Sequence, residues 1–515
     1  MSLTKIAYQA LEDIMGHENV TDDAAIMESY AKNPWPWGIL GKRRPDAVVL
    51  PQVVEEVQSI YRLCNRYGFG VIPAGNYNWD VPLQGNAIVI DSKRMDKIIE
   101  INEKSMYAVV EPAVTHAQLS TEVMKKGLYC NCTLAGGPSS VVANNMFAGM
   151  GGSNYRAGYD RVHLAMEWVL PSGEILNVGS AGIAEAGWFW PEGPGPDFRG
   201  LIRGFFGVFG GFGMVTKLAV KLFHWPGART FNCTGTSGKY RVEFPPERFR
   251  AHMIRYPNRE KMIEGMYEIG KAEIGAAMQY VPPHFLCWLA TPSKEEFWEK
   301  WEKGVFQKYA ENVITLWLVG YSSRAQLTYE EKALQQIIEE TGGEDVQAED
   351  ELMKHVDPAL VAPEFFRCGI SGRVMRPAGT HFIAIVGDDS LDHALKLAKM
   401  GDEVRKDFTS DFMDDGNCDW ICCHDFAWHA DSECLIYPEI TEEGMIKAGE
   451  LAQAGIKKCI EEKIYSTLQA TDTHPVLGPV YGNYHELLKK IKKFIDPNNI
   501  ANPPNPIKVE EVKNR

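Results

Sequence analysis

The first 225 residues alternate short apolar runs with amphipathic segments. Short apolar runs favour strands, whereas apolar residues spaced three and four apart favour helices. The pattern predicts a strand at 45–51, a helix at 53–68, strands at 69–75 and 87–95, a hairpin over 98–115 and a helix at 116–128. We expect the two helices to end at Gly68 and Gly127, since glycine commonly follows the last helical turn.

The pattern changes after about residue 226, where charged helices alternate with longer apolar segments. The run at 313–320 predicts a buried strand, and 374–389 and 417–438 predict further sheet. This succession favours a second domain built on an antiparallel sheet. A helix at 484–495 and a Pro/Asn-rich tail follow. We therefore expect an α+β chain with domains at 1–225 and 226–465, and a segment at 466–515 that packs back on the first domain.

Composition excludes several function classes. The chain has 515 residues, and its 53 basic and 68 acidic side chains give a net charge of −15. Such a chain repels the phosphates of nucleic acid and of an anionic membrane surface. No apolar run approaches the roughly 20 residues that a membrane-spanning helix needs. We expect no nucleic-acid partner and no membrane span.

The N-terminus and the cysteines indicate the compartment. The first 16 residues contain acidic side chains and lack the apolar core of a signal peptide, so they predict an amphipathic helix. The 11 cysteines are scattered and odd in number, which favours free thiols in a reducing environment over a disulfide framework. We expect a cytoplasmic protein.

Three glycine-rich segments, at 73–78, 134–160 and 200–222, lie beside predicted strands. Glycine lets a backbone approach a ligand closely, and several N–H groups together can bind an anion. Three such segments in one domain suit an extended diphosphate ligand. None has the G-x-G-x-x-G spacing of a Rossmann fingerprint, and each taken alone is also compatible with an ordinary turn.

The order of these motifs carries a resemblance to a known family. The runs "RPDAVVLPQVVEEVQSI", "PAGN", "IVIDSKRMDKIIEINEKSMYAVVEPAVT", "GGPSSVVANNMFAG", "MEWVLPSGEIL" and "DFRGLIRGFFGVFGGFGMVTKLAV" resemble the FAD domain of the vanillyl-alcohol oxidase / p-cresol methylhydroxylase (PCMH) flavoproteins over residues 40–222. The segment "LKKIKKFIDPNNIANP" resembles the closing part of the same family. The resemblance implies a PCMH-type FAD-binding domain of two subdomains, an α/β cap domain on a mainly antiparallel sheet, and FAD as cofactor.

The same resemblance assigns cofactor-binding residues. They come from the first glycine-rich segment, from two stretches of the second, and from the end of the third. In chain order they are Pro73, Ala74, Gly75, Asn76, Tyr77, Asn78, Gly136, Gly137, Ser140, Val141, Asn144, Gly151, Gly152, Gly213, Met214 and Val215.

On the substrate side, the resemblance implies hydride transfer from a C–H bond to flavin N5. The Tyr-Arg pair of the phenol-oxidising branch falls at Tyr465-Ser466, so its arginine is missing. The family's aspartate aligns near residues 157–158, close to Asp160. We expect a small alcohol or activated C–H substrate, with aromatic alcohols or alkylphenols favoured.

Two alternatives stay open. One is a 2-hydroxy-acid dehydrogenase of the lactate or glycolate type, but the metal motif Gly-Asp-Gly-Asn-x-His of that branch is replaced by the sequence 414–420, which has no histidine. The other is a flavin-carrying electron-transfer or scaffold subunit without its own substrate. We expect a small-molecule substrate and a homo-oligomer, and an electron-acceptor protein remains open as a second partner.

The segment 418–434 is rich in Cys and His. Residues 418, 420, 422, 424 and 426 alternate as on one strand face, which favours buried cysteines over a metal site, and we expect no metal. His429 is a candidate flavin tether or substrate-side base, against the alternative of a structural histidine. Arg156 is a candidate to neutralise a substrate carboxylate or the reduced flavin, against an ordinary ion pair. His424 and Tyr465 are weaker candidates.

Overall fold

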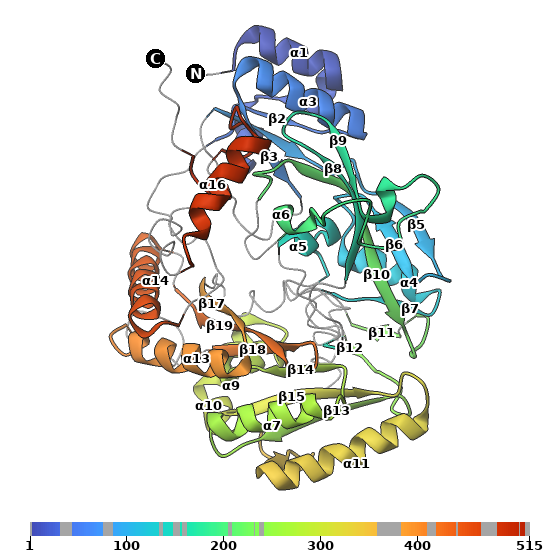
Figure 1. Ribbon diagram of the computed structural model, residues 1–515. Helices are drawn as coiled ribbons and strands as arrows, with labels where there is room; N and C mark the ends of the chain where they lie inside the picture. Colours follow the sequence, from blue (N-terminus) through green and yellow to red (C-terminus); the bar gives the residue numbers. More distant parts are fainter. Residues whose placement is uncertain are drawn as a thin grey trace.

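The structure is a computed structural model in which an N-terminal domain lies above a cap domain in the view of Figure 1. It describes residues 3–30, 44–75, 86–132, 137–147, 155–156, 162–203, 209–230, 232–235, 241–357, 383–408, 419–438, 441–464, 481–503 and 505–509. Among these residues, no helix combines the length and apolarity that crossing a bilayer requires.

The first sheet of the N-terminal domain is mostly parallel. Its strand order is β1-β2-β4-β3, with β1 (Val20–Thr21), β2 (Ala47–Val49), β3 (Gly70–Ala74) and β4 (Ala87–Asp91). The helices α1 (Lys5–Met15) and α3 (Val54–Tyr67) pack on one face of the sheet, and α2 (Ala24–Tyr30) on the other. Gly68 follows α3 with a φ of +73°, as the sequence predicts.

The second sheet is antiparallel and carries the remaining helices of this domain. Its order is β5-β6-β10-β8-β9, with β7 also pairing with β10. The strands are β5 (Ile98–Asn102), β6 (Tyr107–Val110), β7 (Leu128–Cys130), β8 (His163–Val169), β9 (Ile175–Val178) and β10 (Met214–His224), and the helices are α4 (His116–Met124), α5 (Val141–Phe147) and α6 (Arg199–Ile202). The predicted hairpin over 98–115 is confirmed as β5–β6. Helix α4 ends earlier than predicted, because residues 128–130 pair with β10.

The cap domain is built on one antiparallel sheet of order β16-β13-β15-β14-β18-β19-β17, which confirms the antiparallel sheet that the sequence predicts. The strands are β13 (Phe249–Arg255), β14 (Ala277–Tyr280), β15 (Val313–Val319), β16 (Glu344–Asp345), β17 (Ile383–Asp389), β18 (Asp419–His424) and β19 (His429–Ile436). A short pair, β11 (Cys233–Thr234) and β12 (Arg241–Val242), lies between the two domains in the sequence.

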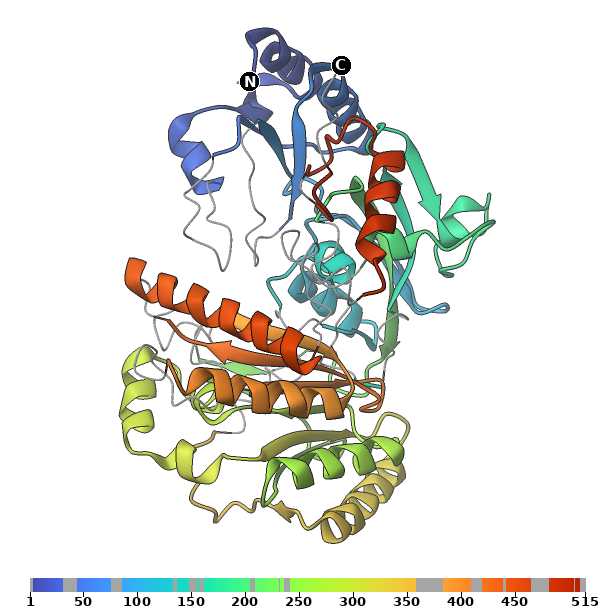
Figure 2. The same cartoon turned by 60° about the vertical axis from the view of Figure 1, so that its left-hand side comes forward.

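The two faces of the cap sheet have different neighbours. One face packs against α7 (Arg259–Lys271), α11 (Arg324–Thr341) and α13 (Leu391–Arg405). The opposite face, which we call the inner face, packs against α8 (Pro283–Leu289), α9 (Lys294–Glu302), α10 (Val305–Tyr309) and residues of the N-terminal domain. Figure 2 shows α13 beside α14 (Glu442–Glu462), the two orange helices at the top of the cap.

The end of the chain returns to the N-terminal domain. Helix α16 (Tyr484–Ile495) has the bounds that the sequence predicts, and both views place it beside that domain. Beyond it, Val71 of β3 donates its N–H to the carbonyl of Ile500 at 2.7 Å and accepts from the N–H of Asn502 at 2.8 Å. The tail thus adds a short parallel bridge to the edge of the first sheet.

Two residues of the N-terminal domain insert into the cap. Tyr155 is fully buried among cap residues, and its backbone accepts from the N–H of Phe426 at 2.9 Å. The guanidinium of Arg156 donates to Glu330 at 2.7 Å and to the carbonyl of Gly275 at 2.5 Å. Tyr155 and Arg156 therefore connect the two domains by polar contacts.

We predict that Arg156→Met lowers the free energy of unfolding by about 2–3 kcal/mol, because it leaves the Glu330 carboxylate buried without its cation. The side chain of Glu330 is only 4% exposed, whereas Arg156 is 24% exposed. The matched control is Arg250→Met, which breaks the more exposed pair of Arg250 with Glu331, the neighbour of Glu330 in α11, and should cost under about 1 kcal/mol. Urea denaturation measures both, and equal losses would contradict the junction role.

Candidate functional site

The structure brings the first and second glycine-rich segments together. A Cβ placed on Gly75 would lie 3.5 Å from the Cβ of Ala143 and 3.7 Å from that of Ser140. Gly75 follows β3, whereas Ser140 directly precedes α5 and Ala143 lies in its first turn. The end of a parallel strand and the start of a helix therefore meet, and both can present backbone N–H groups to a ligand.

The second segment is fastened to the chain before α4. The Ser140 hydroxyl donates to the carbonyl of Pro112 at 2.5 Å and accepts from the N–H of Ala143 at 3.0 Å, so it caps α5. The N–H of His116 binds the carbonyl of Ser139 at 2.9 Å, and the N–H of Val141 binds that of Val114 at 2.9 Å. These bonds fix the backbone beside Gly75.

The third segment packs on the first through positions that only glycine can occupy. Gly210 has a φ of +77°, and a Cβ there would lie 2.2 Å from Cγ of Pro73. Gly213 has a φ of +114°, and its Cβ would lie 2.1 Å from the carbonyl oxygen of Val169. Since a side chain fits at neither position, the backbone of this segment lies directly against β3 and β8.

The described cofactor candidates thus fall in one region of the N-terminal domain. Pro73 and Ala74 end β3 and Gly75 follows it, whereas Gly137 and Ser140 lead into α5 and Val141 and Asn144 belong to it. Met214 and Val215 begin β10 and are buried in the cores that flank it. The other candidates lie outside the described residues: Asn76, Tyr77, Asn78, Gly136, Gly151 and Gly152. The three converging segments fit an extended anionic ligand.

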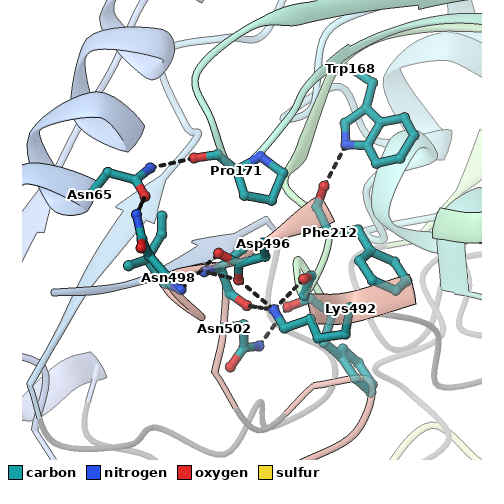
Figure 3. Close-up of polar contacts among 12 residues, drawn as sticks. Asn65, Trp168, Pro171, Phe212, Lys492, Asp496, Asn498 and Asn502 are labelled. Carbon is teal, nitrogen blue, oxygen red and sulfur yellow. Dashed lines mark hydrogen bonds and ion pairs between the residues drawn. The ribbon is translucent and has the colours of Figure 1, made fainter. Parts of the chain in front are cut away.

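Sequence reasoning assigned no role to four residues that hold this region together (Figure 3). Lys492 and Asp496 form a buried ion pair at 2.7 Å, and the Lys492 ammonium also donates to the carbonyl of Gly211 at 2.5 Å. The Asn502 amide donates to the carbonyl of Phe209 at 2.6 Å, and the Trp168 indole donates to that of Phe212 at 2.8 Å. A lysine four residues before an aspartate on an apolar helix face was the signal that could have found the pair.

On the cap side, His429 begins β19 and lies opposite His424, with 5.5 Å between the ring centroids. Burial, reinforced by the neighbouring His429, lowers the pKa of His424 to about 3, so His424 is neutral at physiological pH. The predicted strand face continues only to His424. Phe426 instead lies in the turn, which corrects the prediction that it shares that face.

That turn has a strained backbone. Asp425, Phe426 and Ala427 have φ values of +45°, +55° and +61°, a conformation that costs about 1–2 kcal/mol for each residue with a side chain. The N–H of Phe426 is held by the carbonyl of Tyr155, and its own carbonyl packs closely on Gly270. The insertion from the N-terminal domain therefore supports the turn that places His429.

The inner face of the cap sheet presents buried polar side chains. Gln279, Cys422 and Asp431 are neighbours across three adjacent strands, and Trp420 pairs with Glu433 in the next row. Directly paired residues share a face of an antiparallel sheet. The Trp420 indole donates to the Gln279 amide oxygen at 3.3 Å, and Asp431 and Glu433 are buried. Two carboxyl groups thus lie on the cap face that is turned toward the N-terminal domain.

The remaining substrate-side candidates are not brought together here. The guanidinium of Arg156 contacts Glu330 and lies over the rings of Tyr321 and Phe426, at 5.2 and 5.8 Å from their centroids. Asp160, Tyr465 and Cys418 lie outside the described residues. Within the ranges that the structure describes, no three His, Cys, Asp or Glu side chains are grouped as a metal site.

Comparison with known proteins identifies the ligand of the N-terminal domain. Residues 45–179 match the family model described as an FAD binding domain. The flavoprotein subunit of 4-cresol dehydrogenase (hydroxylating) from Pseudomonas putida is 27% identical over 230 residues, which are 43% of this chain and 43% of that protein. D-2-hydroxyglutarate dehydrogenase from Stutzerimonas stutzeri is 29% identical over 231 residues, 44% of this chain and 47% of that protein. The matched regions thus span less than half the length of these relatives.

A solved structure extends the likeness to the whole fold. The 4-ethylphenol oxidase from Gulosibacter chungangensis superposes with a TM-score of 0.77 at 21% identity, covering 98% of this chain and 97% of that one. At this identity the match shows the fold, in which the cap described above accompanies the FAD-binding domain. The match confirms the α+β architecture of a two-subdomain FAD-binding domain with a cap.

We predict that Gly210→Ala weakens FAD binding at least tenfold, because a methyl group there would overlap Pro73 and displace the third segment from the first. The matched control is Gly68→Ala. Gly68 has a similar φ of +73° with no atom within 4 Å of a Cβ, so its backbone strain of about 1–2 kcal/mol comes without a clash. Titration of the apoprotein with FAD measures both variants, and equal affinities would contradict the packing argument.

Proposed function

Because this chain is a member of the vanillyl-alcohol oxidase / p-cresol methylhydroxylase flavoprotein family, we propose that it is an FAD-dependent oxidoreductase acting on a small alcohol or an activated C–H bond. Aromatic alcohols and alkylphenols are the favoured substrates. The related fold of 4-ethylphenol oxidase was solved in complex with isoeugenol, and 4-cresol dehydrogenase acts on a phenol by its name.

The two buried acidic side chains of the inner cap face are the observation that carries the proposed substrate class. Asp431 and Glu433 are 0% and 7% exposed and stand on the side turned to the N-terminal domain. An acidic side chain offers no positive charge to the carboxylate of a 2-hydroxy acid, whereas its carboxyl oxygens accept a hydrogen bond from a neutral alcohol or phenol. The cap face therefore favours a hydroxyl-bearing substrate without its own negative charge.

The contacts of Arg156 also favour a substrate without a carboxylate. In a hydroxy-acid dehydrogenase, we would expect a guanidinium free to bind the substrate carboxylate. The guanidinium of Arg156 already binds Glu330 and the carbonyl of Gly275. It contributes instead to the junction between the domains.

The bound FAD would supply the two-electron chemistry, accepting hydride from the substrate carbon. The residues of this chain would position the cofactor and the substrate and would accept a proton. Gly75 and Ser140 would hold the cofactor through backbone N–H groups at the junction of β3 and α5. A carboxylate oxygen of Glu433 would accept the hydroxyl proton of the substrate, and Trp420 beside it would pack on an aromatic ring and exclude water.

We predict that anaerobic addition of a 4-alkylphenol or a benzylic alcohol bleaches the flavin absorbance, whereas D-lactate and glycolate do not. Glu433→Gln should slow the bleaching by about a hundredfold, since it removes a base, and should leave the FAD content unchanged. Glu331→Gln, at a partly exposed carboxylate of α11, is the control. Bleaching by hydroxy acids alone would overturn the proposed substrate class.

The runner-up is a 2-hydroxy-acid dehydrogenase, supported by the likeness to D-2-hydroxyglutarate dehydrogenase in the N-terminal region. A third possible function is that of a flavin-carrying electron-transfer or scaffold subunit. This function would be favoured if a protein donor reduced the flavin and none of these substrates did. We also propose that the protein is cytoplasmic and forms a homo-oligomer. An electron-acceptor protein is a further partner under this proposal.

We further propose His429 as a covalent tether of the flavin, or otherwise as a base on the substrate side. It stands at the supported turn beside His424, whose neutral ring adds no competing charge. If His429 is the tether, the yellow colour should stay with acid-precipitated protein and should move to the supernatant in His429→Ala. His424→Ala is the matched control. Colour that is released from the natural protein would rule out a tether of any kind.

A further inference from the structure

The backbone of the third segment shows an unusual division between its carbonyl and N–H groups. All four carbonyls from residue 209 to residue 212 accept hydrogen bonds within the protein. They bind Asn502, the N–H of Gly213 at 3.1 Å, Lys492 and Trp168, in that order along the chain. Three of these four donors are side chains, and two of those come from the end of the chain (Figure 3).

Two N–H groups of the same stretch differ from these carbonyls. Among the residues that the structure describes, the N–H groups of Gly211 and Phe212 have no acceptor, although both residues are buried. Buried backbone N–H groups are nearly always paired, and leaving one unpaired costs free energy. A stretch with every carbonyl bound and its buried N–H groups open is suited to an acceptor from outside the chain.

Lys492 is the residue on which this arrangement depends most. Its ammonium is 0% exposed and donates three bonds, to the carbonyl of Gly211, to the carbonyl of Ala501 and to Asp496. Asp496 in turn accepts from the N–H groups of Ile500 and Ala501, at 3.0 and 2.9 Å. The charge is therefore fully neutralised and hydrogen-bonded, as a buried ion pair must be to persist.

The contacts of the tail extend this network to the other segments. Residue Asn505 lies so close to Gly211 that a Cβ on the glycine would be 2.2 Å from its carbonyl oxygen. Gly210 packs on Pro73 at the end of β3, and the tail bridges the same strand at Val71. The third segment is thus held between β3 on one side and the C-terminal tail on the other.

We propose that Lys492 is the positioning residue of the FAD site: with Asp496 and Asn502 it fixes the backbone of residues 209–213 so that the N–H groups of Gly211 and Phe212 bind acceptor atoms of FAD. This inference rests on the proposed function, since it assumes that FAD occupies the junction of the three segments. It also has a consequence for assembly. Lys492 follows Gly211 by 281 residues, so the site is completed only after the C-terminal segment has been synthesised and has docked.

The test measures FAD affinity and not turnover. Lys492→Met removes the ammonium and keeps the length of the side chain, and we expect its dissociation constant for FAD to rise at least tenfold, as followed by quenching of flavin fluorescence on titration of the apoprotein. Two lysine controls should bind FAD like the natural protein. Lys489→Met changes a partly exposed lysine of the same helix, and Lys217→Met breaks the half-buried pair of Lys217 with Glu167.

A second variant covers the case in which Lys492→Met does not fold. Asn502→Ala deletes only the side-chain bond to the carbonyl of Phe209, and it keeps the backbone bond to Val71. We expect Asn502→Ala to weaken FAD binding with little change in the melting temperature of the apoprotein. A purely structural role would lower the melting temperature and leave the affinity of the folded protein for FAD unchanged.

The outcomes separate this inference from the proposed function. If the folded variants, Lys492→Met or Asn502→Ala, bind FAD within threefold of the natural protein, the positioning role is wrong and the FAD site stands. If the natural protein itself binds no FAD, the proposed function fails first. Weakened binding in these variants together with unchanged binding in both lysine controls supports the inference.

Discussion

The buried ammonium of Lys492 joins two parts of the backbone that are far apart in the sequence. It contacts Gly211 in the third glycine-rich segment, and Asp496 and Ala501 in the segment that follows α16. A buried charge is tolerated only when its partners are complete, so these parts must be in place together. The cofactor region then follows from close packing, because Gly210 and Gly213 let the same backbone lie against β3 and β8 without a side chain between them.

The cap is tied to this region by a second set of contacts. Tyr155 and Arg156 follow the second glycine-rich segment in the sequence and are bound in the cap by Glu330, Gly275 and Phe426. The strained turn after β18 is supported by Tyr155 and sets the start of β19, where His429 stands. The position of the inner cap face is thereby coupled to the segment that precedes the insertion.

Sequence periodicity predicted the elements whose local pattern agrees with their packing. Helix α16 is an example, since its apolar spacing gave both ends. Helix α4 was predicted too long, because strand pairing of residues 128–130 with β10 overrides a helical propensity that is only local. The glycine-rich segments could be found because glycine is required there by close backbone contact.

The polar contacts could not be predicted, because their partners are distant in the sequence. Arg156 was a candidate for catalysis until the structure placed Glu330, 174 residues away, against it. Lys492 is one of four lysines in α16, and only its spacing from Leu488 and Asp496 distinguishes it as the buried one. The strained turn at 425–427 carries no glycine that would have signalled its backbone conformation.

Calorimetric titration of the apoprotein with FAD tests the central claim most directly, because the account requires one dinucleotide held by all three segments at once. It predicts saturation at one FAD per chain, with a yellow complex that melts at a higher temperature than the apoprotein. A colourless protein that gives no heat with FAD, and whose melting temperature FAD does not change, would contradict it.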